Sequence, residues 1–135
     1  MSQVTLHIEV DINPTESEEK VRKAIWNLFG EISAKVEASR QGSILTAQEK
    51  GPEGLITFRN ILRRDHIRDA ARRALNHSLR DHTFAFYLNK QAAFAGHVSF
   101  SEAEAESPLG PIRVTVVADE PLNLIDWIAP KTAKD

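Results

Sequence analysis

The first dozen residues alternate between apolar and polar side chains. The apolar positions are Val4, Leu6, Ile8, Val10 and Ile12, and a polar residue stands between each pair. A period of two is typical of a β-strand with one face buried and the other open to solvent. Because the buried face needs a cover, this strand predicts a sheet with other elements packed against one side.

A helix is expected directly after this strand. Asn13-Pro14-Thr15 provides a stop and a cap, and acidic residues follow where a helix N-terminus favours negative charge. From Glu16 to Phe29 apolar residues recur every three or four positions, as in a helix packed on a sheet, and Gly30 is placed to end it.

Further strand patterns predict that the sheet continues. They run over Ile32 to Ala38, Ser43 to Glu49, Thr83 to Leu88, Ala93 to Phe100 and Ile112 to Val117. The first two of these are expected to form one hairpin, and the next two a second hairpin with Asn89-Lys90-Gln91 in its turn. Near the end, Leu124 to Pro130 resembles one apolar helical turn that docks onto the body.

The segment from Leu55 to Leu79 is helical in pattern but does not keep one phase. Phe58 and Leu62 define a first apolar stripe, and Ile67 with Ala71 continues one residue out of step. One straight helix would turn one of these stripes toward water, so the segment predicts two helices or a kink near residues 64 to 66.

Length and composition predict one α+β domain over residues 1–130, with residues 131–135 as a frayed tail. The 135 residues are 41% apolar, enough for one core, and we expect a mixed or mostly antiparallel sheet with helices on one face. No membrane-spanning run and no signal-peptide pattern is seen, and cysteine is absent. These features favour a cytoplasmic protein.

The charge is unevenly distributed along the chain. The net charge is −2, but residues 54–82 hold seven arginines and three aspartates, which leaves the remainder at −6. Such a distribution can create a basic face on an acidic protein and favours an anionic partner. A solvated helix with internal ion pairs is the alternative.

Arginines recur every four residues at Arg64, Arg68 and Arg72, which would align them on one helical face, with Arg63 and Arg73 beside them. Guanidinium groups form bidentate contacts with phosphates, so this stripe is the candidate nucleic-acid contact. Conversely, Asp65 and Asp69 are spaced to form intrahelical ion pairs with the arginines that follow them.

Lys90 and Gln91 are a second candidate contact, although the turn that holds them is more simply interpreted as closing a hairpin. No metal site is expected, because the five histidines lack metal-ligand spacing, and no nucleotide or cofactor fingerprint is present. Paired carboxylates occur only where solvation explains them, so no catalytic residue is assigned.

Four segments together resemble an uncharacterised archaeal protein family, number two hundred and one of the uncharacterised families. They are the opening strand with Asn13-Pro14-Thr15-Glu16, the arginine-rich stretch from Leu62 to Arg72, the run from Leu88 to Gly96, and Ile125 to Pro130. The resemblance implies a fold similar to the large-subunit ribosomal protein that binds the small ribosomal RNA. It therefore favours RNA as a partner.

Three hypotheses about function follow. The first is an RNA-binding module without catalysis that uses Arg63, Arg64, Arg68 and Arg72, with Lys90 and Gln91 as further contacts. The second is a protein-interaction or structural module, including a homodimer, that uses an apolar sheet face or the regions of Trp26 and Trp127. The third is an enzyme that binds a small anion through Arg68, Lys90 and Gln91, for which no base or nucleophile is evident.

Overall fold

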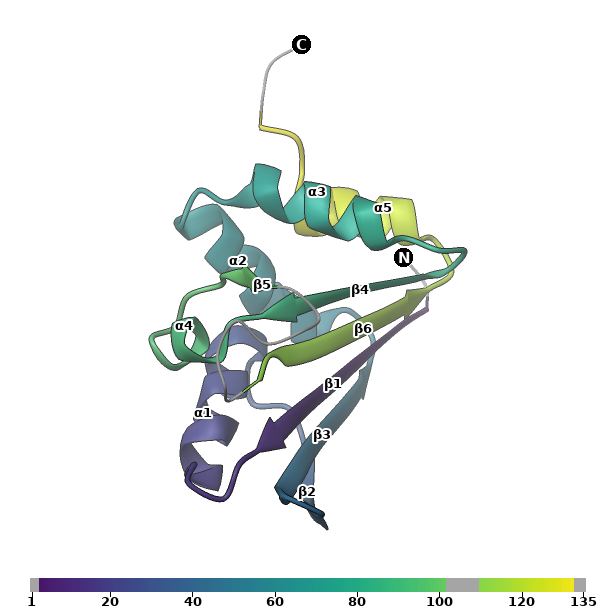
Figure 1. Cartoon of the computed structure of the whole chain (residues 1–135). Coiled ribbons are helices and arrows are strands. Elements are labelled where there is room, and N and C mark those ends of the chain that lie inside the picture. The colour runs from purple at the N-terminus through teal and green to yellow at the C-terminus, as the bar shows by residue number, and fades with distance from the viewer. Residues whose placement is uncertain (1–2, 102–109, 133–135) are drawn as a thin grey trace.

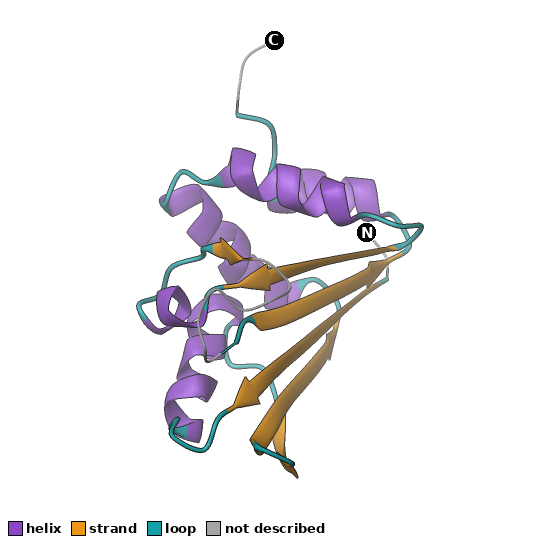
Figure 2. Cartoon of the chain, viewed as in Figure 1, coloured by secondary structure: helices purple, strands orange, loops and turns teal. Residues whose placement is uncertain are grey.

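The structure is a computed structural model that describes residues 3–101 and 110–132. One sheet carries helices on one side of it (Figures 1 and 2). The strands are β1 (Val4–Ile12), β2 (Ala34–Ser39), β3 (Gly42–Lys50), β4 (Thr83–Leu88), β5 (Phe100–Ser101) and β6 (Ile112–Ala118). The helices are α1 (Glu18–Phe29), α2 (Ile56–Arg64), α3 (Arg68–Ser78), α4 (Lys90–Phe94) and α5 (Pro121–Ile128), and a short 3-10 turn (Glu53–Leu55) precedes α2.

The sheet has the order β2-β3-β1-β6-β4-β5, and each pair of neighbouring strands is antiparallel. The opening strand β1 therefore lies inside the sheet, between β3 and β6. This arrangement confirms the predicted α+β class and the antiparallel sheet with its helices on one face.

The alternating side chains of β1 face a buried side of the sheet and a solvent-exposed side in turn. Leu6, Ile8 and Val10 are fully buried, whereas His7 on the opposite face is exposed. Phe58 of α2 stacks on Phe29 of α1 with ring centroids 5.5 Å apart, and on Phe86 of β4 at 5.3 Å. These aromatic contacts join two helices to the sheet in one core.

The hairpin β2–β3 and the strands β4 and β6 confirm the sequence predictions to within two residues. The first helix begins slightly later than expected. Ser17 is its N-cap, and the Ser17 side chain accepts a hydrogen bond from the Lys20 amide at 3.3 Å. Glu16 instead folds back, and its Oε1 accepts a hydrogen bond from the Asn13 amide at 2.9 Å.

The predicted strand from Ala93 to Phe100 is wrong. Asn89 does not form a hairpin turn but caps α4, and its side chain accepts a hydrogen bond from the Ala92 amide at 2.9 Å. The physical reason is local, because Asn is a good N-cap and the alanine-rich residues after it favour a helix. Among the described residues, the strand that pairs with β4 at this edge is the two-residue β5.

The C-terminal helical turn is longer than expected, since α5 starts at Pro121. The predicted frayed tail falls largely outside the described residues, as does most of the acidic run at residues 101–107. None of the helices within the described ranges is long and apolar enough to cross a bilayer.

Candidate nucleic-acid interface

The arginine-rich segment is divided between two helices. α2 ends at Arg64 and α3 begins at Arg68, and His66 between them has a φ of 58°. The Ile67 amide then donates to the Leu62 carbonyl at 3.0 Å. The predicted break near residues 64 to 66 is confirmed, and it interrupts the continuous stripe that the four-residue spacing suggested.

Arg64, at the end of α2, connects this helix to the loop after α4. Its Nη2 donates to the Gly96 carbonyl at 2.7 Å, and its Nε donates to Asp65 Oδ1 at 2.9 Å. Asp65 Oδ2 also lies 2.8 Å from His97 Nδ1. The hydrogen bonds from Arg64 and then from His97 hold the pKa of Asp65 far below its usual range.

Two other arginines hold the C-terminal helix. Arg59 Nε donates to the Trp127 carbonyl at 2.8 Å, and its guanidinium lies 5.2 Å from the centre of the Trp127 ring. Arg72 donates to the Ala129 carbonyl at 3.1 Å and forms an ion pair with Asp126 at 2.6 Å. The last carbonyls of a helix lack partners within the helix, so these side chains complete the end of α5.

Arg80 makes similar contacts at the end of α3. Its Nη1 donates to the Leu79 carbonyl at 2.8 Å and to the His77 carbonyl at 3.4 Å. Arg59, Arg64, Arg72 and Arg80 therefore use their side chains for contacts within the fold.

The three remaining arginines of the segment are Arg63, Arg68 and Arg73. Among the described residues, none of their side chains makes an ion pair or a hydrogen bond, and Arg63 and Arg73 are exposed. Ala71 and Leu75 face the core from α3. Arg73 lies on the opposite side of that helix, whereas Arg68, three positions before Ala71, lies on the same side in the first turn and is partly exposed. Their guanidinium groups are available to a ligand.

The predicted intrahelical ion pairs do not form within the described part of the chain. Asp65 pairs with Arg64 and His97, as given above, and both carboxylate oxygens of Asp69 accept from the Thr132 hydroxyl at 2.7 Å. Neither aspartate forms an ion pair with Arg68 or Arg73, so both guanidinium groups are without a carboxylate partner among the described residues.

Lys90 lies in the interior. Only 1% of its side chain is exposed, and its Nζ donates to the Asp11 carbonyl at 2.7 Å and to Glu16 Oε1 at 3.0 Å. A phosphate could not reach this ammonium group without displacing the fold around it. Gln91, its neighbour, is exposed on α4.

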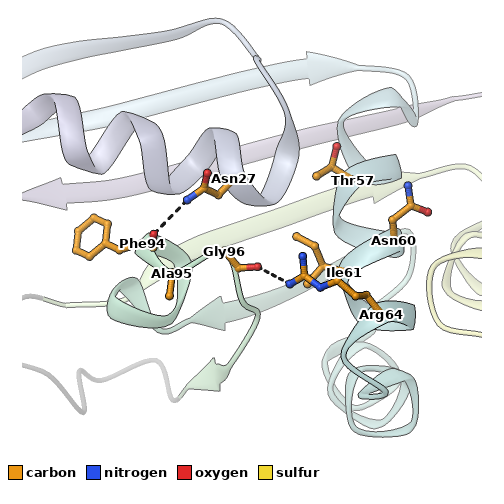
Figure 3. A pocket seen from close by; sticks show the side chains of 8 residues that line it. All are labelled: Asn27, Thr57, Asn60, Ile61, Arg64, Phe94, Ala95 and Gly96. Carbon is orange, nitrogen blue, oxygen red and sulfur yellow. Dashed lines mark hydrogen bonds between the residues drawn. The ribbon is translucent and has the colours of Figure 1, made fainter.

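A pocket of about 420 Å³ opens between α1, α2 and the loop after α4 (Figure 3). Asn27, Thr57, Asn60 and Arg64 provide its polar groups. The Asn27 amide nitrogen donates to the Ala93 carbonyl at 3.0 Å, so α1 and α4 are bound together at its wall. Sequence reasoning missed this pocket, because no local pattern brings Asn27 to the neighbourhood of Asn60.

The pocket presents polar groups beside an apolar surface. The side chains of Asn60 and Thr57 carry donors and acceptors that make no hydrogen bond with a described residue, and Ile61 adds an apolar surface. Amide and hydroxyl groups of this kind recognise the edges of unpaired nucleobases. In the described ranges, no group of three or more potential ligand side chains could hold a metal ion.

Comparison with known proteins gives the family. A family model described as RNA binding matches residues 5–118. A UPF0201 protein from Sulfurisphaera tokodaii is 47% identical over 127 residues, covering 94% of this chain and 88% of the relative. A UPF0201 protein from Methanopyrus kandleri is 43% identical, with 90% of this chain and 81% of the relative covered.

Solved structures agree with this assignment. The crystal structure of a UPF0201 protein from Methanococcus jannaschii has a TM-score of 0.79 and 34% identity, over 97% of this chain and 95% of that chain. A DUF54 protein from Methanothermobacter thermautotrophicus, at 15% identity and a TM-score of 0.59 over 94% of both chains, shares the fold. The chain belongs to the UPF0201 family.

Proposed function

We propose that this protein binds RNA through phosphate contacts from Arg63, Arg68 and Arg73, and that it carries out no reaction on the RNA. The observation that carries the proposal is that the seven arginines of residues 54–82 fall into two groups, with and without hydrogen-bond partners within the fold. Four of them make hydrogen bonds within the fold, and the side chains of these three make no hydrogen bond or ion pair with a described residue. Guanidinium groups without internal partners are the groups best suited to binding phosphates.

The match to a family model described as RNA binding supports this proposal. So does the local charge, because residues 54–82 carry +4 while the rest of the chain carries −6. The acidic remainder repels a polyanion, so RNA would be held at the basic surface alone and with modest affinity.

Arg64 has a mixed role in this proposal. Its contact with Gly96 is structural, but 56% of its side chain remains exposed at the rim of the pocket. We therefore retain Arg64 as a contact, and Gln91 as an exposed polar group on α4. We leave out Arg72, which is held by Asp126, and Lys90, which is buried.

The pocket beside Arg64 would accept one unpaired base of the bound strand. A phosphate on Arg63 or Arg64 would place the adjoining nucleotide near Asn60 and Thr57, which can hydrogen-bond to a base edge. Single-stranded RNA is accordingly the preferred form, because a base within a duplex is not available to a pocket.

The test compares two triple variants in fluorescence anisotropy with a labelled single-stranded RNA at low salt. The first variant combines Arg63→Glu, Arg68→Glu and Arg73→Glu. The second variant combines Lys20→Glu, Lys23→Glu and Lys131→Glu, three exposed positions elsewhere, and so changes the net charge by the same amount. We expect binding to be lost in the first and retained in the second. Equal loss in both would show that only total charge matters.

A further inference from the structure

Within the described part of the chain, strand β2 is an edge of the sheet with one unpaired side. It stands first in the strand order and pairs there with β3 alone, in a register that runs from Ala34 opposite Ala47 to Ser39 opposite Gly42. Figure 1 shows it at the outer end of the sheet. An edge strand presents backbone donors and acceptors to which another strand can pair.

The hairpin turn determines which backbone groups face outward. Ser39 and Gly42 close a turn of two residues, so they form a hydrogen-bonded pair, and such pairs alternate along an antiparallel ladder. The residues with outward backbone groups are then Ala34, Val36 and Ala38. An independent contact agrees, since the Ala34 carbonyl accepts a hydrogen bond from Arg22 Nη1 of α1 at 3.2 Å.

We propose that two copies of this protein pair through β2 in an antiparallel, two-fold arrangement centred on Val36. Val36 of each copy would exchange both backbone hydrogen bonds with Val36 of the other. The Ala34 carbonyl, although already bound by Arg22, has a second lone pair for the amide of Ala38 in the other copy. The result is one continuous sheet across the dimer.

Charge complementarity at this register identifies the partner as a second copy. Lys35 and Glu37 stand on either side of Val36, so the two-fold axis places Lys35 opposite Glu37 of the other copy, twice. Both side chains are mostly exposed, at 76% and 71%, and share one face of the strand, where they lie 3.4 Å apart. Opposite charges directly across an antiparallel pair stabilise it, and like charges destabilise it.

The same two charges discriminate against other strands. A lysine on an edge strand normally discourages pairing with foreign chains. Here it is placed two residues from a glutamate, so the sequence Lys35-Val36-Glu37 is complementary to itself when reversed. An unrelated strand would need the same charge order to pair equally well.

A tryptophan from α1 borders this edge on the helix side. Trp26 is 42% exposed, and its Nε1 donates to the Ile32 carbonyl at 3.3 Å, just before β2 begins. Exposed aromatic side chains are enriched at the centres of protein interfaces. A second copy paired along β2 would cover Trp26 and add apolar contact to the backbone hydrogen bonds.

Sedimentation velocity over a range of concentrations tests the dimer through charge reversal. Lys35→Glu and Glu37→Lys each create like charges across the axis, so each should weaken dimerisation roughly tenfold. The double variant with both changes restores opposite charges and should recover the wild-type dissociation constant. Lys131→Glu, an exposed charge that follows α5 and is not part of β2, is the control and should leave dimerisation unchanged.

Val36→Pro is the second test, because it removes the central outward amide. That amide makes no ladder bond within one copy, so the variant should keep its circular dichroism spectrum and melt as a folded monomer. A wild-type protein that stays monomeric up to near-millimolar concentration would overturn the proposal. So would a dimer that survives Val36→Pro, or a charge swap that fails to restore what the single reversals weaken.

Discussion

Lys90 and Glu16 form a buried ion pair across 74 positions of the chain. Their charged atoms lie 3.0 Å apart, and only 1% and 7% of the two side chains are exposed. Glu16 also accepts hydrogen bonds from the amide and side chain of Asn13. The pair therefore fixes the turn after β1 to the start of α4.

Replacement of Lys90 should destabilise the protein without impairing RNA binding. Lys90→Met leaves the Glu16 carboxylate buried without its cation, at a cost of about 3 kcal/mol in the free energy of unfolding. Urea unfolding measures this loss, and anisotropy at a temperature where the variant is folded should give the wild-type affinity. In the double variant with Glu16→Gln, the loss should be smaller than the sum of the single losses. Additive losses would show that the two side chains do not interact.

The same pair should make stability depend on acid pH. Burial raises the pKa of Glu16, but the hydrogen bonds from Asn13 and Lys90 outweigh it, so the pKa lies below its ordinary value of about 4.3. A carboxyl group with a lowered pKa in the folded state stabilises the fold above its unfolded pKa and loses this contribution as pH falls through the folded value.

We therefore expect the free energy of unfolding to decrease below about pH 4.3. Glu16→Gln should flatten this decrease in urea titrations at successive pH values. It should not abolish it, because the pKa of Asp65 is lowered as well and acts in the same direction. Parallel curves for the wild type and Glu16→Gln would contradict this account.

The hydrogen bond from Arg72 to the Ala129 carbonyl should contribute more to the free energy of unfolding than its ion pair with Asp126. Arg72→Ala leaves the Ala129 carbonyl, on a fully buried residue, without this donor, which costs about 1 to 3 kcal/mol. Asp126→Asn keeps that donor and removes an exposed charge, so it should cost less than about 1 kcal/mol. Urea unfolding of both variants decides the order, and amide hydrogen exchange in α5 should accelerate only for Arg72→Ala. A larger loss in Asp126→Asn would reverse the assignment.

Much of the fold could be predicted because it depends on local periodicity. The alternation in β1 and the phase change between Leu62 and Ile67 each report burial directly, and both predictions are confirmed. The segment after Asn89 was misjudged because a short apolar run is compatible with a strand or a helix. Its alanines and its N-cap favoured the helix that the structure contains.

The candidate site was less predictable because side-chain partners come from distant parts of the chain. Nothing near Lys90 in the sequence indicates that it forms an ion pair with Glu16. Likewise, nothing near Arg72 indicates that its ion-pair partner is Asp126. Spacing identified an arginine-rich helical region correctly. Spacing could not distinguish Arg68 and Arg73, whose side chains form no hydrogen bond or ion pair with a described residue, from Arg59 and Arg72, which bind α5.

The salt dependence of RNA affinity tests the central claim most directly. Each phosphate neutralised on a single strand contributes roughly −0.7 to the slope of log affinity against log salt concentration. Contacts from Arg63, Arg68 and Arg73 therefore predict a slope near −2, and a fourth contact from Arg64 would bring it near −3. Anisotropy titrations of the wild-type protein with single-stranded RNA at several salt concentrations give this slope. A slope of about −2 to −3 that falls by about 2 in the Arg63, Arg68 and Arg73 triple variant is the predicted result. Absence of salt-dependent binding by the wild type at low salt, or an unchanged slope in that folded variant, would contradict the proposed function.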